Sequence, residues 1–224
     1  MPFEDAMKER PILFSGSMVR ALLAGTKTQT RRVAKPVRHP DLGNVYAPGA
    51  LVLEHEPQHV IDRCCPYGRP GDRLWVRECY SGPHWMTGMP PREWIPGTPL
   101  WFWADGRIPT HGDWTKPKPG MHMPRWACRI LLEITSVRVE RLQDINQADA
   151  QAEGAPPSHP SIDQISREFG YPDFPRSWYA QLWEEINGPG SWAQNPWVWV
   201  VEFKRVQQAS SGRPSQLEEA PCSA

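Results

Sequence analysis

Apolar and polar residues alternate in several stretches of the chain that we predict to be β-strands. The clearest are the strand or strand pair predicted at residues 125–141, which contains most of ILLEITSVRVERL, and WVWVVEFKRV at 197–206. Alternation with a period of two is typical of strands, because successive side chains point to opposite faces. A Pro-Gly-Asp turn precedes a further strand at 73–78, and threonines favour another within 26–33. We also predict a short strand at LVLEH, residues 51–55.

Two stretches have apolar residues at helical spacing between capping residues. The first helix begins at the hydroxyls of Ser15-Gly-Ser17 and ends at Gly25. The second is capped by Asn146, has Asp149 at its third position as in a capping box, and ends at Gly154. Both helices are short and lie next to predicted strands.

A third, longer helix is predicted at residues 176–187, and Gly188-Pro189 ends it. Its Trp178, Leu182 and Ile186 repeat every fourth residue. We therefore expect this face to pack on the core. A shorter helix is predicted at IDQISREFG, residues 162–170.

The order of these elements predicts one α+β domain over residues 1–206, a small mixed β-barrel with short helices between the strands. The 26 prolines indicate long, stiff connections. We assign them to Pro- and Trp-rich insertions at about 36–66, 80–122 and 155–175, the second with a hairpin turn at Asp105-Gly106. Residues 207–224 are polar and predicted to be disordered.

Composition narrows the class of protein. The chain has no apolar run near the roughly 20 residues that a membrane span needs, and its N-terminus does not resemble a signal peptide. The five cysteines have neither the paired spacing of a disulfide framework nor that of a metal knuckle. We expect a cytoplasmic protein that does not bind membranes.

Positive charge is concentrated in one segment of a chain whose formal net charge is zero. Residues 18–40 contain six Lys or Arg and no Asp or Glu. A local positive field on a neutral protein indicates a defined anionic partner. The alternative is a solvated strand edge, where cations discourage aggregation. Charge alone favours neither interpretation.

Two patterns suggest chemistry but have simpler explanations. HEPQH at 55–59 matches a zinc-protease motif, yet Pro57 disfavours the helical turn that the motif requires. We therefore expect no metal and no other cofactor. Seven tryptophans lie between Trp75 and Trp126, where stacking on unpaired bases is the minority alternative to ordinary burial.

Glu153 is placed unusually for a carboxylate. It falls in the last turn of a predicted helix, where carbonyl dipoles disfavour negative charge. Such departures from local preference tend to occur at functional sites. An exposed glutamate tolerated at modest cost is the alternative, and this observation alone favours the alternative.

Four motifs together resemble a known family: GTKTQTRR after a short helix, PGDRLWVRE, ITSVRVERLQDINQADAQAEG and WVWVVEFKRV. They resemble the ASCH domains, small β-barrels related to the PUA fold that bind RNA or nucleosides. The resemblance covers the predicted strands in order, about half of the chain, and the long insertions resemble those of ASCH-like proteins of phages and prophages. It implies a PUA-like barrel whose partner is a nucleoside or RNA.

One branch of the family hydrolyses the non-peptide C–N bond of N4-acetylcytidine with a lysine, a threonine three residues on and a distant glutamate. Matched by motif, these fall on Lys27, Thr30 and Glu153, and an arginine two residues past the threonine falls on Arg32. The resemblance thus implies an amidohydrolase, and it selects the glutamate already noted for its position.

The implied residues suit this chemistry. A threonine hydroxyl needs a neighbouring base, and a lysine serves only when its pKa is lowered, by burial and by Arg31 and Arg32. Glu153 would then protonate the leaving amine. Arg32 or a backbone amide at the Gly25 turn would stabilise the oxyanion. Alternatively, Thr30 orients the substrate while Lys27 and Glu153 activate water.

We expect the substrate to be bound by cations and an aromatic ring of two strands: Arg31, Arg32, Trp75 and Arg77. Three other functions remain open. A non-catalytic RNA- or modified-base-binding domain would show an affinity that depends on salt through Arg31, Arg32, Lys35 and Arg38. A metal-dependent ribonuclease is disfavoured because the sequence has no clear carboxylate cluster, and a structural role in phage assembly is weaker.

Overall fold

The computed structural model describes residues 6–106, 114–157, 159–170 and 173–206. The tail at 207–224, for which we predict disorder, lies outside the described residues, as do residues 107–113 of the second predicted insertion. None of the helices in the described part combines the length and the apolar character that crossing a membrane requires.

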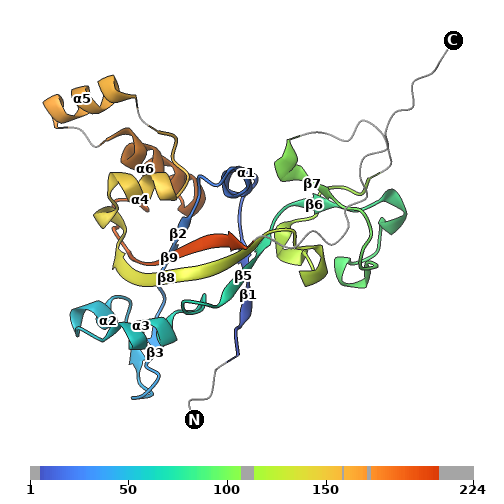
Figure 1. Ribbon diagram of the computed structural model, residues 1–224, viewed down its shortest axis with the longest axis horizontal. Helices are drawn as coiled ribbons and strands as arrows, with labels where there is room; N and C mark the ends of the chain where they lie inside the picture. The colour runs from blue at the N-terminus through green and yellow to red at the C-terminus, as the bar shows by residue number, and fades with distance from the viewer. Residues whose placement is uncertain (1–5, 107–113, 158, 171–172, 207–224) are drawn as a thin grey trace.

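A five-stranded mixed sheet forms the centre of the structure (Figure 1). Its order is β1-β5-β8-β9-β2, with β1 parallel to β5 and every other neighbouring pair antiparallel. The strands are β1 (Glu9–Leu13), β2 (Gln29–Val33), β5 (Arg73–Arg77), β8 (Leu131–Arg141) and β9 (Trp197–Val206). The strands expected within 26–33, 73–78, 125–141 and 197–206 are therefore confirmed, and the fold is α+β.

The sheet is open, so the predicted closed barrel is wrong. Strands β1 and β2 are its two edges, and they do not pair with each other in the described structure. The chain leaves β1 after five residues and enters α1 (Gly16–Ala24) directly. Side chains fill the seam between the edges: Arg32 donates to the Leu13 carbonyl at 2.8 Å, and its guanidinium lies 5.4 Å from the centre of the Phe14 ring.

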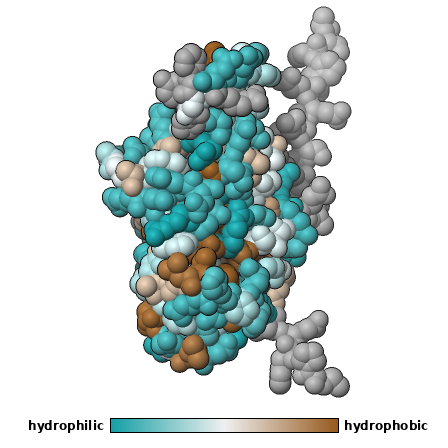
Figure 2. Space-filling model, turned by 90° about the vertical axis from the view of Figure 1, so that its left-hand side faces the viewer, coloured by the Kyte–Doolittle hydropathy of each residue, from teal (hydrophilic) through white to brown (hydrophobic). Residues whose placement is uncertain are grey.

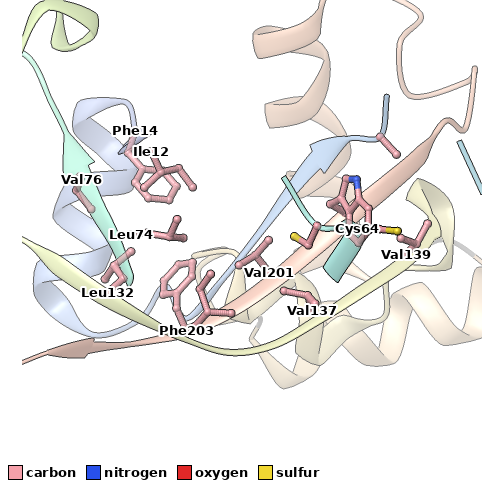
Figure 3. Close-up of a cluster of buried hydrophobic side chains, with 14 of the residues drawn as sticks. Ile12, Phe14, Cys64, Leu74, Val76, Leu132, Val137, Val139, Val201 and Phe203 are labelled. Atoms are coloured by element: carbon pink, nitrogen blue, oxygen red, sulfur yellow. The ribbon is translucent and has the colours of Figure 1, made fainter. Parts of the chain in front are cut away.

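Strand β9 is buried on both faces, which explains its continuous apolar run WVWVV. On one face Val201 and Phe203 join the main core, together with Ile12, Phe14 and Leu74 from other elements (Figure 3). On the other face Val198 and Val200 pack in a second core with residues of α4 (Gln147–Ala152) and α6 (Phe174–Asn187). The sheet is therefore a shared wall between two cores.

Helix α1 and helix α4 form as the capping residues predict. Ser15 accepts from the Met18 amide at 3.4 Å, and Gly25 closes α1 at φ 76°. Asn146 accepts from the Asp149 amide at 2.8 Å. The Thr28 amide donates to the Ala152 carbonyl at 2.8 Å. This bond ties the start of β2 to the C-terminal end of α4.

The core-facing side of α6 differs from the prediction. The buried residues are Pro175, Tyr179 and Trp183, whereas Ile186 is 51% exposed and Trp178 only packs against the edge of the second core. The helix turns this aromatic face inward because Tyr179 also contacts Trp192, whose ring centre lies 6.3 Å away. The contact between Tyr179 and Trp192 therefore decides which of two adjacent stripes of the helix faces the core.

The first predicted insertion has its own secondary structure. It contains β3 (Val37–Arg38), β4 (Val45–Tyr46), α2 (Ala50–Leu53) and α3 (Gln58–Cys64). The strand predicted at 51–55 is wrong, because Gly49, at φ 87°, starts a helical turn that buries Leu51 in the main core. Its exposed large hydrophobic residues are Leu42, Val45 and Leu53. Figure 2 shows hydrophobic residues gathered in the lower half of the face turned to the viewer, below a largely hydrophilic upper half.

The second predicted insertion builds a small separate core around Tyr80, Met86 and Trp94. Its β6 (Tyr80–Ser81) pairs with β7 (Trp101–Phe102). Asp105-Gly106 is not a hairpin turn as predicted, since it ends a 3-10 turn that follows β7.

The 3-10 turns of the described residues are η1 (His84–Met86), η2 (Pro91–Glu93), η3 (Trp103–Asp105), η4 (Gly120–His122), η5 (Arg125–Ala127) and η6 (Leu142–Asp144). The third insertion contains α5 (Pro160–Phe169), which confirms the short helix expected there.

Gly154 allows the end of α4 to pack closely on α1 and on Lys27, which precedes β2, and its replacement provides a test. Its φ is 103°, and a Cβ there would lie 3.3 Å from the Ala21 Cβ and 3.7 Å from the Lys27 Cβ. We expect Gly154→Ala to lower the free energy of unfolding by about 2–4 kcal/mol, through backbone strain and crowding. Gly170→Ala, at φ 68° with open space around it, should cost only about 1 kcal/mol. Urea denaturation measures the free energy of unfolding of both variants. Equal losses would show that close packing around Gly154 adds nothing to the cost of its backbone strain.

Candidate functional site

A buried ion pair joins the start of β2 to the end of α4. The Lys27 ammonium donates to Glu153 Oε2 at 2.7 Å and to the Glu153 carbonyl at 2.9 Å. The two residues are 126 positions apart in the chain and each is 3% exposed. The hydrogen bond from Thr28 to Ala152 brings them together. Glu153 is therefore buried and paired, in contrast to the exposed glutamate of the alternative interpretation.

Arg31 extends this pair into a network. Its guanidinium contacts Glu153 Oε1 at 3.3 Å, Glu140 Oε1 at 2.5 Å and Asp149 Oδ2 at 3.2 Å, and its side chain has no solvent exposure. Arg138 contacts Glu140 and Asp149 as well, at 2.9 and 3.1 Å. Two cations of the positive segment, Lys27 and Arg31, are thus balanced by carboxylates from β8 and from the α4 region.

Burial of these charges shifts the acid–base behaviour of the site. The pKa of Lys27 is lowered from 10.5, chiefly by burial; Glu153 opposes this shift, and Arg32 and Arg31 add to it. The pKa of the Tyr179 hydroxyl is raised well above 10, again chiefly by burial and then by Glu153. The lowered pKa of Lys27 is the direction expected from the sequence.

A small cavity of about 50 Å³, with polar and apolar side chains in its lining, lies beside the network. Thr30, Arg32 and Glu153 line one side, and Tyr179 and Trp183 of α6 line another. A cavity of this size holds a few water molecules or a group of a few heavy atoms. Lys27 does not line the cavity and lies next to Glu153, so the structure brings Thr30 and Glu153 to a common surface with the amine adjacent.

A larger groove of about 530 Å³ adjoins the cavity at the open seam of the sheet. Met18, Arg32 and Ile186 line both spaces. The rest of the groove is mostly apolar, and its lining includes Pro11, Ile12, Leu13, Phe14 and Tyr67. The seam that keeps the sheet from closing therefore provides space for a ligand much larger than the cavity alone can hold.

The structure does not bring all of the expected substrate-binding residues together. Trp75 and Arg77 are on β5, three strands away from β2 in the sheet. Trp75 packs against Cys128 and Leu131, and the Arg77 guanidinium lies 4.5 Å from the centre of its ring. Neither lines the cavity or the groove. Of the expected set, Arg31 and Arg32 reach the cavity, and Arg31 is fully engaged by carboxylates.

The backbone at the Gly25 turn offers no oxyanion site, contrary to one expectation. The amide of Gly25 donates to the Leu22 carbonyl at 3.2 Å. The amides of Thr26 and Lys27 both donate to the Ala21 carbonyl, at 3.0 and 3.2 Å. These amides close α1 and are not available to a ligand. Arg32 is the cation that lines both the cavity and the groove.

HEPQH does not form the helical turn of a zinc-protease motif. His55 has φ 56°, and Pro57 is the N-cap of α3. In the described part of the chain, no three His, Cys, Asp or Glu residues lie arranged to hold a metal ion.

The contributions of α6 and of the acidic residues around Arg31 were not predicted from the sequence. Tyr179, Trp183 and Asn187 line the cavity and are spaced every fourth residue. This stripe is one position away from the predicted stripe of Trp178, Leu182 and Ile186. Helical spacing alone does not distinguish the two stripes. Glu140 and Asp149 were visible as acids, but their pairing with Arg31 depends on the β8–β9–β2 order of the sheet.

Comparisons with known proteins give weak structural likenesses. No protein-family model and no curated protein matches the chain. Two solved structures match it with probability 1.00. The first is an ASCH domain. It comes from Lactobacillus crispatus JV V101, is 10% identical, has a TM-score of 0.35, and the match covers 88% of this chain and 79% of that one.

The second match is a DUF984 protein of Enterococcus faecalis V583, 12% identical, with a TM-score of 0.36 and coverage of 94% of this chain and 87% of that one. The ASCH family of the first match is the family that the sequence motifs resemble. At these TM-scores the likeness carries no argument about activity.

Removal of one partner from the buried pair should destabilise the protein strongly. Glu153→Gln leaves the Lys27 ammonium buried without its countercharge, and we expect a loss of about 3–5 kcal/mol in the free energy of unfolding. The double variant Lys27→Met/Glu153→Gln should recover part of this loss. Glu185→Gln, at an exposed position of α6, should change stability by less than about 0.5 kcal/mol. Urea denaturation of these three variants and of Lys27→Met alone completes the cycle, and additive single effects of Lys27 and Glu153 would contradict the coupling.

The lowered pKa of Lys27 predicts a pH dependence of stability. The unfolded chain keeps this proton up to about pH 10.5, whereas the folded chain loses it at lower pH. Between these two values the unfolded state binds more protons, so the free energy of unfolding rises with pH. Lys27→Met should lack this rise.

The difference between wild type and Lys27→Met isolates the effect of this lysine. Burial raises the pKa of Tyr80 to about 12, which lowers stability in alkali, but this contribution is common to both proteins. Denaturant titrations across the alkaline range measure the two curves. Parallel curves would show that Lys27 has the same pKa in the folded and unfolded states.

Proposed function

We propose that this chain is an ASCH-like domain that recognises a nucleoside or a nucleic-acid base and hydrolyses the amide of an N4-acylated cytidine. One observation carries the proposal: Lys27 and Glu153 form a buried pair at 2.7 Å beside a cavity that Thr30 and Glu153 both line. A purely structural ion pair does not require an adjoining cavity lined by a hydroxyl. The motif resemblance supplies the reaction and the substrate class.

In the proposed reaction the Thr30 hydroxyl attacks the acyl carbon. The O–H bond breaks, an O–C bond forms, and the proton passes to the Lys27 amine, whose lowered pKa makes the neutral form accessible. The hydrogen bond from Nζ to Glu153 Oε2 then carries the proton to the carboxylate. Glu153 delivers it to the departing cytosine nitrogen as the C–N bond breaks. In the second half of the reaction the same pair takes a proton from water, whose oxygen bonds to the acyl carbon. The Thr30 O–C bond then breaks, the proton returns to the Thr30 oxygen, and the acyl group leaves as the carboxylic acid.

The two spaces suit the two parts of such a substrate. The acyl amide must reach Thr30 and Glu153, which line the small cavity. The cytosine and its sugar are too large for that cavity and would lie in the adjoining groove, where Met18, Ile186 and the Phe14 ring offer apolar contacts to a planar base. Arg32 lines both spaces and would stabilise the oxyanion.

A non-catalytic base-binding domain is the second candidate, favoured by one feature. The Lys27 amine already donates to two oxygens, and the Arg31 guanidinium contacts three carboxylates. Such saturation is typical of a rigid binding site. The salt-dependent contacts would then come from Arg32 and the exposed Lys35 and Arg38, since Arg31 is withdrawn from solvent.

Thr30→Val separates catalysis from folding, because it removes a hydroxyl and leaves every charge of the network in place. We expect it to lower the rate of N4-acetylcytidine hydrolysis by at least about 100-fold, since the nucleophile or orienting hydroxyl is lost. The melting temperature should change by only a few degrees. Mass spectrometry of the released cytidine measures the rate.

Thr28→Val is the matched control, an exposed threonine two residues earlier whose backbone makes the bond to Ala152. It should keep the wild-type rate. If wild-type protein binds N4-acetylcytidine without releasing cytidine, the binding function replaces the enzymatic one. A Thr30→Val variant that is as active as wild type would reject the assignment of Thr30.

A further inference from the structure

One buried polar group at the cavity has no partner and no role in the reaction described above. Trp183 lines the cavity and is 4% exposed. Its indole N–H is buried and has no acceptor among the described residues. Buried donors in native proteins are almost always hydrogen-bonded, because an unpaired one loses its water without compensation. A donor left open beside a cavity therefore indicates an acceptor supplied by whatever occupies that cavity.

The position of Trp183 is fixed by its neighbours. Tyr179 packs against it one turn earlier on α6, with ring centres 6.3 Å apart. One turn later Asn187 donates to the Trp183 carbonyl at 3.0 Å and also lines the cavity. The indole is thus held by the second core on one side and borders the polar cavity on the other. Such a preorganised donor costs little to align when a ligand binds.

Trp199 offers a contrast within the same protein. Its indole N–H is also buried without a partner, and the residue is 1% exposed. It belongs to the main apolar core and lines neither the cavity nor the groove. The Trp199 indole is therefore not accessible to a ligand that binds in either space. The Trp183 indole can contact such a ligand, because Trp183 lines the same cavity as Thr30 and Glu153.

We infer that the Trp183 indole N–H donates a hydrogen bond to the acyl carbonyl oxygen of the bound substrate. The inference rests on the proposed function for the identity of that carbonyl. The cavity accepts only a few heavy atoms, and the acyl amide is the part of the substrate that must reach Thr30. Trp183 and Arg32, from different elements of the cavity wall, would then act as two donors to the oxygen that becomes negative in the transition state.

The first test observes the indole proton directly. In ¹⁵N-labelled protein, the Trp183 indole resonance is identified by its loss in Trp183→Phe. We expect it to move downfield on addition of N4-acetylcytidine and to stay in place with cytidine, which lacks the acyl carbonyl. The Trp199 resonance should not move with either. Spectra of Thr30→Val give the same comparison without turnover during the measurement.

The second test is kinetic. Trp183→Phe should weaken the binding of N4-acetylcytidine by about 3- to 10-fold and lower kcat by about 10- to 100-fold, because the donor is worth more to the developing oxyanion than to the neutral carbonyl. Trp199→Phe is the control for loss of an equally buried indole and should leave both values near wild type. If Trp183→Phe does not fold, site-specific replacement by benzothienylalanine keeps the bicyclic ring and removes only the N–H.

The outcomes distinguish this inference from the proposed function. A shifted Trp183 resonance with no hydrolysis would reject the enzymatic proposal and retain the carbonyl contact. Hydrolysis with an unmoved Trp183 resonance would overturn the contact and retain the enzyme. A resonance that moves equally with cytidine and N4-acetylcytidine, or with neither, overturns the inference as well.

Discussion

The buried charge network around Arg31 is the constraint on which the rest of the site depends. A guanidinium and an ammonium without solvent exposure must be neutralised by carboxylates at close range. These carboxylates come from β8 and from the α4 region, and Arg31 reaches both from β2, an edge strand of the sheet. The network thus fixes where α4 ends relative to β2. It also holds Glu153 at the wall of the cavity while Lys27 stays behind it.

The open seam of the sheet and the polar cavity are two consequences of one arrangement. Because β1 and β2 remain unpaired, the space between them is lined by Phe14, by Arg32 and by the start of α1. This space is the apolar groove, and it shares Met18, Arg32 and Ile186 with the small cavity that Arg31 and Glu153 of the charged network line. A closed barrel would have replaced the groove with backbone hydrogen bonds. The absence of pairing between β1 and β2 therefore leaves a groove in which a ligand can bind.

Helix α6 closes one side of the cavity beside the charged network. Its Tyr179 and Trp183 cover the second core and form the wall opposite Thr30. Burial in this wall raises the pKa of Tyr179, so its hydroxyl stays protonated and available as a donor over a wide pH range. The cavity thus has several hydrogen-bond donors and Glu153 as its carboxylate, next to the apolar side chains of Met18, Val33, Leu182 and Ile186. That balance suits a ligand that presents carbonyl oxygens.

The sequence by itself determined the local elements of this protein, because caps, turns and strand periodicity act over a few residues. It placed α1 between Ser15 and Gly25, and it singled out Glu153 at the end of α4. Only the tertiary structure decided that the sheet stays open, that Tyr179 rather than Trp178 faces inward, and that Trp75 lies far from β2. These features depend on which strands pair and on which aromatic rings meet across the chain, and residues far apart in sequence decide both.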